Sequence, residues 1–146
     1  MNWRKEAADK LKDYQARKKA VDNILEEISR LKAESTRIRS AVTDSTPIHG
    51  GGGSTREDAL LSNIALRDEL KGRLQDTRRW LATVDRALNE LTDEERLVLD
   101  RFYIHRAKGN VEILMEELHL EKSAVYEKKD RALRRFTLAL YGAVES

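Results

Sequence analysis

Hydrophobic residues recur every three or four positions along the first part of the chain. Because an α-helix turns every 3.6 residues, this spacing places them on one helical face. The pattern predicts one long helix from about Trp3 to Val42, with Lys18 and Ser35 interrupting the apolar stripe. The stripe consists of Trp3, Ala7, Leu11, Tyr14, Val21, Leu25, Ile28, Leu31, Ile38 and Val42.

Residues 43–55 break this rhythm. They contain the single proline of the chain, Pro47, and the four glycines of 50–53. Glycine imposes little backbone preference and loses much entropy when it is ordered. The sequence therefore predicts a flexible Gly-rich loop over residues 43–55.

A second helical stripe follows the loop. Ser54 with Glu57, or Thr55 with Asp58, can form a capping box that starts this helix. The apolar positions then continue in the same rhythm through Leu60, Ile64, Leu70, Leu74, Leu81, Val84, Leu88 and Leu91.

Two long amphipathic helices joined by such a loop can fold back on each other as an antiparallel, coiled-coil-like hairpin. We assign residues 1–91 to this hairpin, as a region for oligomerisation or partner binding. Two helices cannot enclose a core, because each apolar stripe keeps exposed edges. We therefore expect a homodimer formed through the hairpin; the alternative is that the hairpin packs only on its own C-terminal region.

A second boundary is predicted at Thr92. Thr92 and Glu95 have the spacing of a capping box, and Asp93 and Glu94 lie where the helix dipole favours anions. A third helix is expected over about 93–106. Its inward-facing residues are predicted to be Leu97, Val98, Phe102 and Tyr103.

The last third of the chain contains two further amphipathic helices on either side of a tight corner. Leu114 and Leu118 lie one turn apart on the first, and Val125 and Leu133 mark the inward face of the second. Two helices joined in this way are typical of a helix-turn-helix, whose second helix enters the DNA major groove. The expected fold is thus all-α, with a helix-turn-helix domain over residues 92–146.

The limits of these two helices follow from local signals. The first is expected to begin near Val111, and the second near Lys122 or Ser123 with Gly142 as its end.

A helix-turn-helix usually has a small residue, a corner glycine and an apolar residue at three positions that here hold Met115, His119 and Lys128.

The inward pattern leaves one face of the last helix free to contact DNA. Lysine and arginine pair with phosphates, Tyr126 can stack on a sugar or touch a thymine methyl group, and Glu127 can accept a hydrogen bond from cytosine. Ser123 is expected to be the helix N-cap, and the stem of Lys128 to cover the edge of the core with its ammonium in solvent. A solvated helix face is the alternative. The candidate DNA-binding residues are Lys122, Ser123, Tyr126, Glu127, Lys129, Arg131, Arg134 and Arg135.

The overall charge and composition indicate little more about the partner of the protein. The 28 basic and 26 acidic side chains give a net charge of +2, too close to neutral to indicate a polyanionic partner, although cations are concentrated in residues 122–135. The chain has no cysteine, which fits a reducing cytoplasm. No signal peptide or membrane-spanning segment is expected.

The segments LTDEERLVLDRFY and LEKSAVYEKKDRALRRF resemble the region of bacterial sigma factors that recognises the upstream promoter hexamer. The whole layout, including the Gly-rich loop, resembles phage and prophage late-gene transcriptional regulators of the ArpU and RinA type. This resemblance implies a sequence-specific transcriptional regulator in the cytoplasm of a bacterial host. It places Lys122, Ser123, Tyr126 and Glu127 at DNA-contacting positions and adds RNA polymerase as an optional partner.

Two other functions stay open: a phage assembly or packaging protein of the small-terminase kind, and a polymerase-binding module that does not bind DNA. An enzyme is not expected, because no nucleophile, acid and base can be assembled. Glu116 and His119 have the spacing of a di-iron ligand pair, but such a site needs the motif twice. We expect no cofactor and no metal.

Overall fold

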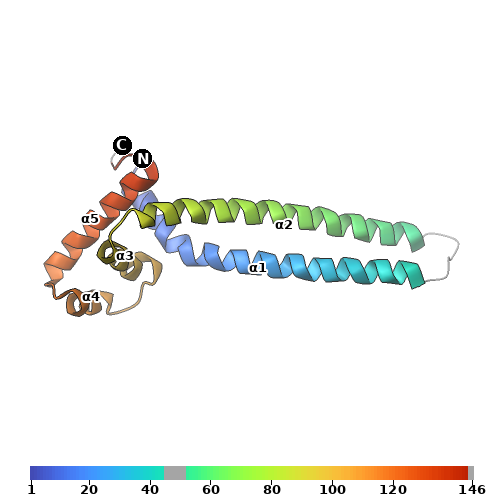
Figure 1. Ribbon diagram of the computed structural model, residues 1–146, viewed down its shortest axis with the longest axis horizontal. Helices are drawn as coiled ribbons and strands as arrows, with labels where there is room; N and C mark the ends of the chain where they lie inside the picture. Colours follow the sequence, from blue (N-terminus) through green and yellow to red (C-terminus); the bar gives the residue numbers. More distant parts are fainter. Residues whose placement is uncertain (45–51, 145–146) are drawn as a thin grey trace. The chain divides into compact units, whose positions relative to one another are not determined.

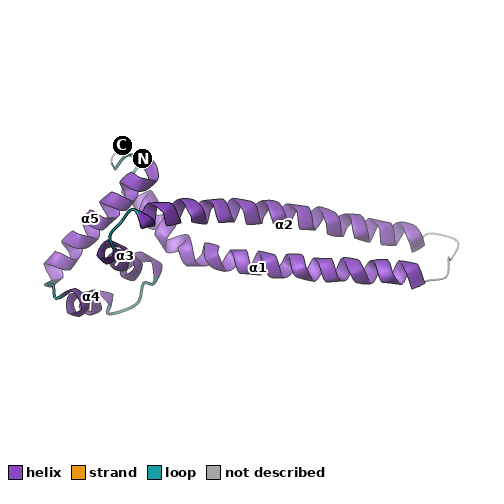
Figure 2. Ribbon diagram, in the orientation of Figure 1, coloured by secondary structure: helices purple, strands orange, loops and turns teal. Residues whose placement is uncertain are grey.

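The computed structural model describes residues 1–44 and 52–144, and this part of the chain is helical without strands (Figures 1 and 2). The expectation of an all-α protein is confirmed. The elements are α1 (Trp3–Asp44), α2 (Gly52–Asn89), α3 (Asp93–Leu99), the π-helical turn η1 (Asp100–Ile104), α4 (Asn110–Leu118) and α5 (Lys122–Tyr141).

The chain divides into two compact units, and each contains a part of α1 and a part of α2. Unit 1 comprises Met1–Lys18 and Arg79–Ser146, and unit 2 comprises Lys19–Arg78. The domain boundary expected between residues 91 and 92 therefore lies inside unit 1. The reason is that the beginning of α1 and the end of α2 share a core with α3 and α5.

Unit 1 has two clusters of buried hydrophobic residues. The smaller cluster joins Val98, Leu114 and Val125. The larger cluster draws on α1, α2, α3 and α5 and consists of Ala7, Ala8, Leu11, Val84, Ala87, Leu91, Leu99, Ala132, Leu133 and Phe136.

Helix α3 contributes to both clusters, and this explains why the sequence pattern did not predict the burial of Leu99. Val98 is fully buried as expected, whereas Leu97, Phe102 and Tyr103 are only partly buried. Leu99 was not predicted to face inward, yet it is also fully buried. Consecutive residues of one helix point in different directions, so both are buried only where the helix is covered on two sides.

Unit 2 contains a much smaller core. Ile28 and Leu31 of α1 pack with Leu70 and Leu74 of α2. A buried polar residue accompanies them: the Asn63 side-chain amide donates to the Leu31 carbonyl at 2.8 Å. The predicted stripe is incompletely covered. Among the described side chains of this unit, the exposed large apolar ones are Leu25, Leu61, Ile64 and Leu66.

Both flanking helices extend into the loop predicted over residues 43–55. Helix α1 continues to Asp44 and α2 begins at Gly52, so residues 45–51 of that prediction lie outside the described residues. The start of α2 precedes both predicted capping boxes. The first amides of a helix have no acceptor within it, so two glycines can extend the helix without losing a hydrogen bond.

The capping box predicted at Thr92 is confirmed in atomic detail. The Thr92 hydroxyl accepts from the Glu95 amide at 3.2 Å, and the Glu95 carboxylate accepts from the Thr92 amide at 3.0 Å. The third helix does not continue as an α-helix to residue 106. It changes at Asp100 into a π-helical turn, in which the His105 amide donates to the Asp100 carbonyl at 2.7 Å.

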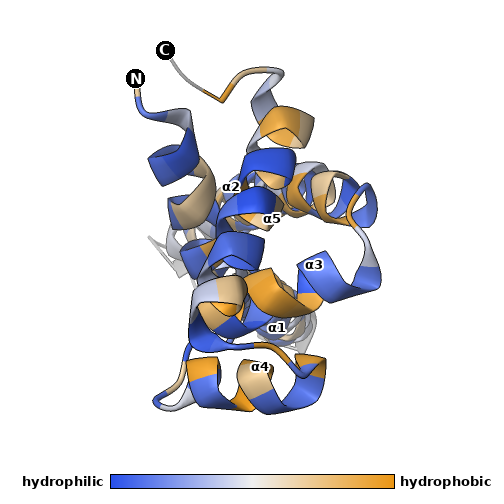
Figure 3. Cartoon of the chain, turned by 90° about the vertical axis from the view of Figure 1, so that its left-hand side faces the viewer, coloured by the Kyte–Doolittle hydropathy of each residue, from blue (hydrophilic) through white to orange (hydrophobic). Residues whose placement is uncertain are grey.

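The side chain of Asn110 stabilises the end of this turn, because its amide donates to the carbonyls of Arg101 and His105. Gly109, with a φ of 84°, then leads into α4, and Gly142, with a φ of 70°, ends α5 as predicted. Hydrophilic and hydrophobic segments alternate along α4 in Figure 3, as expected for a helix with one buried face.

Candidate nucleic-acid interface

Helices α4 and α5 meet at a tight corner that His119 makes possible. His119 has a φ of 54° and a ψ of 46°, the left-handed conformation that glycine adopts most easily, and the Leu120 amide donates to the Met115 carbonyl at 3.0 Å. The corner therefore has the geometry for which a glycine is usual, although the residue is histidine. A non-glycine residue in this conformation costs about 1–2 kcal/mol.

Buried side chains fix α5 against the rest of unit 1. Leu114 of α4 and Val125 of α5 are both fully buried and pack with Val98 of α3. Leu133 is buried in the larger cluster. The inward positions predicted for these two helices are thus confirmed, with Leu118 partly buried at the edge.

The N-cap of α5 is Glu121, so the prediction that Ser123 caps the helix is wrong. After the left-handed His119, the backbone is extended at Glu121 and becomes helical at Lys122. Ser123 is therefore the second helical residue and is exposed. The Glu121 side chain makes no capping hydrogen bond, and the first turn of α5 carries no acidic residue.

Seven of the eight candidate DNA-binding residues are exposed. Tyr126 retains 39% of its accessible surface and packs edge-on against Phe102, with ring centres 5.7 Å apart. The exposed set is Lys122, Ser123, Tyr126, Glu127, Arg131, Arg134 and Arg135.

The eighth candidate, Lys129, is turned toward aromatic rings. Its ammonium lies 5.4 Å from the ring centre of Phe102 and 5.5 Å from that of Tyr126, and it pairs with Asp130 at 3.3 Å. Only 22% of its side chain is exposed.

Two cations of α5 form ion pairs with α3, and sequence reasoning missed both. Arg135 pairs with Glu95 and also donates to the Glu90 carbonyl at 3.4 Å. Lys128 pairs with Glu94 at 2.6 Å, so the expectation that its ammonium only reaches solvent is wrong. Glu94 and Glu95 lie in the first turn of α3, where α5 passes close enough to pair with both. By contrast, Lys122, Arg131 and Arg134 make no ion pair with any described residue.

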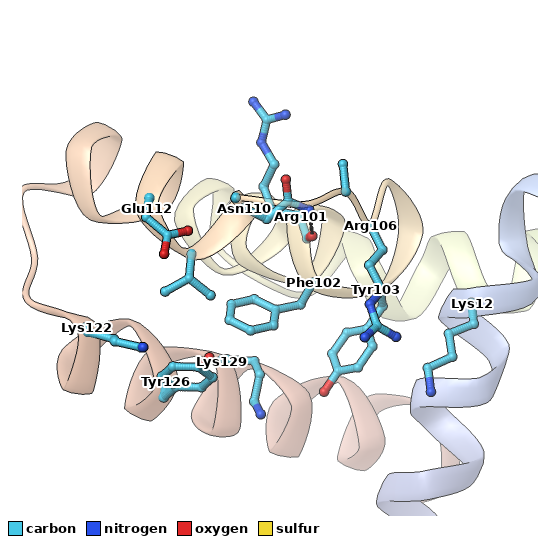
Figure 4. Close-up of a pocket in the computed structure, with 13 residues that line it drawn as sticks. Lys12, Arg101, Phe102, Tyr103, Arg106, Asn110, Glu112, Lys122, Tyr126 and Lys129 are labelled. Carbon is cyan, nitrogen blue, oxygen red and sulfur yellow. Dashed lines mark hydrogen bonds between the residues drawn. The ribbon is translucent and has the colours of Figure 1, made fainter.

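A cavity of about 410 Å³ opens beside the first two turns of α5 (Figure 4). Its walls come from four places: α1, η1 with the loop after it, the beginning of α4, and α5. Three candidate residues line it: Lys122, Tyr126 and Lys129. The other lining residues are Lys12, Arg101, Phe102, Tyr103, Arg106, Ala107, Gly109, Asn110, Val111 and Glu112.

The cavity is strongly cationic. Five basic side chains line it, and Glu112 is the one carboxylate among the lining residues. Burial raises the pKa of Tyr103, and nearby Lys129 only partly offsets this effect. The Tyr103 hydroxyl therefore stays neutral at physiological pH and adds no negative charge. Sequence analysis missed Lys12, Arg101 and Arg106, and for Lys12 no local signal exists, because it lies on the first helix.

A polar contact between two side chains connects α1 and α2 within unit 1. The Tyr14 hydroxyl donates to the Asp85 carboxylate at 2.6 Å. Burial, and then this hydrogen bond to a charged acceptor, raise the pKa of Tyr14 to about 12. Tyr14 therefore stays protonated over the physiological range and can donate this hydrogen bond throughout.

Two further findings concern other kinds of site. Glu116 and His119 belong to no group of three or more potential metal ligands within residues 1–44 and 52–144. No helix in the described part of the chain has the length and apolar character needed to cross a bilayer.

Comparison of the chain with protein-family models, with curated proteins and with solved structures found no match.

Proposed function

We propose that the protein is a sequence-specific, DNA-binding transcriptional regulator of phage or prophage genes. In this proposal α4 and α5 form a helix-turn-helix, and α5 enters the major groove by its N-terminal end. The observation that carries it is the exposed group Lys122, Ser123, Tyr126 and Glu127, presented directly after the left-handed corner at His119.

The position of Lys122 supports a binding role. The positive end of the helix dipole makes a cation unfavourable in the first turn, by about 0.3–1 kcal/mol. Lys122 is the first residue of α5, and no acidic residue of that turn and no side-chain cap compensates for it. The stability of α5 therefore does not explain this lysine, whereas a phosphate would pair with it favourably.

The remaining candidates have separate roles in this proposal. Arg131 and Arg134 are exposed cations available to phosphates, which provide affinity without sequence information. Tyr126 and Glu127 can contact base edges. Arg135 and Lys129 also stabilise the domain, through Glu95 and the aromatic rings respectively.

We further propose that α1 and α2 form an antiparallel hairpin through which two chains pair. The exposed residues Leu25, Leu61, Ile64 and Leu66 of unit 2 support this, since a second hairpin would cover such a surface in a four-helix bundle. Among these four residues Leu61 is the most exposed, with 64% of its surface accessible. A dimer would present two copies of α5 to a symmetric site. RNA polymerase is an additional candidate partner.

The test is to select bound sites from random duplex DNA and then measure binding to the selected site and to a scrambled duplex at the same salt concentration. The double variant Lys122→Ala with Tyr126→Ala should lower the preference for the selected site about 5- to 160-fold with unchanged helix content, because a lost base contact is worth about 1–3 kcal/mol. Arg134→Ala is the matched control on the same helix and should weaken both complexes equally.

Two outcomes would refute the proposal. Absence of salt-sensitive DNA binding by the unmodified protein would favour a polymerase-binding interaction module. A ring of many chains in solution mass measurements, with binding restricted to a packaging site, would favour the small-terminase kind of protein.

A further inference from the structure

The cavity beside α5 contains more cations than the proposed recognition helix supplies. Lys12 comes from α1 and Arg106 from the loop after η1, whereas Lys122 and Lys129 come from α5. Lys12, Arg106 and Lys122 are not in an ion pair with any residue that the structure describes. Like charges that face one space without counterions repel each other, so this arrangement does not stabilise the free protein.

Some of the lining cations lie in the cavity, whereas Arg101 points away from it (Figure 4). Lys122 lies at one end of the cavity and Lys12 at the other, and the guanidinium group of Arg106 lies beside Tyr103. Arg101 points away from this space, and its guanidinium pairs with Glu117 of α4 at 3.2 Å. Arg101 is therefore a structural residue, and Lys12 and Arg106 are the additional free cations.

We propose that this cavity binds the phosphodiester backbone of the duplex that α5 reads, with Lys12 and Arg106 as phosphate-contacting residues. The inference rests on the proposed DNA-binding function and extends it to a residue of α1. The DNA interface then includes the beginning of α1 as well as α5.

The spacing of the lysines along α5 is compatible with this occupant. Lys122 and Lys129 are seven residues apart on α5, or about 10 Å at 1.5 Å per residue. One strand of B-DNA carries a phosphate every 3.4 Å of helix axis, so the two lysines are far enough apart to contact different phosphates of one strand. Lys122 and Tyr126 both line the cavity and belong to the exposed end of α5, so a backbone in the cavity would be continuous with the groove that α5 enters.

The decisive measurement is the dependence of DNA affinity on salt. The double variant Lys12→Ala with Arg106→Ala should lower affinity for selected and scrambled duplexes equally, by about tenfold, and reduce the slope of log K against log salt by about 2. Both residues are exposed, so folding should be unaffected, which circular dichroism would verify. The charge-preserving variant Lys12→Arg with Arg106→Lys should keep the original slope.

Two matched controls sharpen the result. Lys32→Ala with Lys71→Ala removes two exposed cations from unit 2 and should leave the slope unchanged. Glu112→Gln removes the carboxylate of the cavity and should raise affinity for every duplex, an effect of opposite sign.

The possible failures are distinguishable. If the unmodified protein prefers its selected site but the Lys12 and Arg106 variant keeps the slope, the inference is wrong while the proposed function stands. If the variant loses binding to single-stranded DNA only, the occupant is a single strand and the inference is again wrong. If the unmodified protein binds no duplex, both proposals are refuted.

Discussion

Helix α1 passes through two very different environments. Leu11 in unit 1 is fully buried in a cluster that draws on four helices, whereas Leu31 in unit 2 is buried mainly against one neighbouring helix. Apolar residues recur every three or four positions in both parts of the helix. Periodicity therefore indicates which face of a helix is apolar, but the number of elements packed on that face decides how well a core is enclosed.

The largest expected effect comes from truncating the same residue type in the two environments. Leu11→Ala should lower the free energy of unfolding by about 4 kcal/mol and Leu31→Ala by about 2 kcal/mol, because a thin core can relax around the smaller side chain. Denaturant unfolding of both variants would measure this difference. Because the proposed pairing of two chains would enclose unit 2, the measurement is made at protein concentrations low enough to keep the chain monomeric. Equal losses under those conditions would contradict the comparison.

A smaller effect on stability is expected from the buried polar residue of unit 2. Asn63→Leu should change the free energy of unfolding by less than about 1.5 kcal/mol. It removes the hydrogen bond donated to the Leu31 carbonyl and the one accepted from the Arg67 guanidinium, but the added apolar surface offsets part of this loss. Polar residues at such positions fix the register of paired helices. The variant should therefore show mixed registers or oligomeric states. Crosslinks between single introduced cysteines would detect them, because the chain has none of its own.

The smallest effect concerns Tyr14 and Asp85, the corresponding polar contact of unit 1. Folding raises the pKa of Tyr14 from 10.0 to about 12, so the contact contributes fully below pH 10 and is lost as the pH rises through 12. The stability difference between the unmodified protein and Tyr14→Phe should shrink over that interval. Unfolding measured at several alkaline pH values would test this, and a constant difference would contradict it.

Sequence signals between near neighbours predicted local structure well. Thr92 and Glu95 form the expected capping box, Gly142 ends α5, and Leu114 and Val125 face inward. Each of these features depends on residues within about one or two helical turns, where spacing determines geometry.

Features that depend on distant parts of the chain were not predictable in this way. The pairing of Arg135 with Glu95 joins residues 40 positions apart, and Lys12 reaches the cavity from the first helix. The incorrect assignment of Ser123 as an N-cap has a local cause. His119 adopts a left-handed conformation that starts α5 earlier, and nothing in the type of that residue requires this.

The π-helical turn Asp100–Ile104 has a consequence for insertions and deletions. Its hydrogen bond from His105 to Asp100 spans five residues, so the turn accommodates one residue more than an α-helical turn would. Deleting one residue there would allow continuous α-helical bonding but rotate everything after it by about 100° relative to α3. His105 would then leave Gln15, its partner on α1. A single codon lost at this point, other than that of Arg101, would thus alter the cavity wall without removing any of its cations.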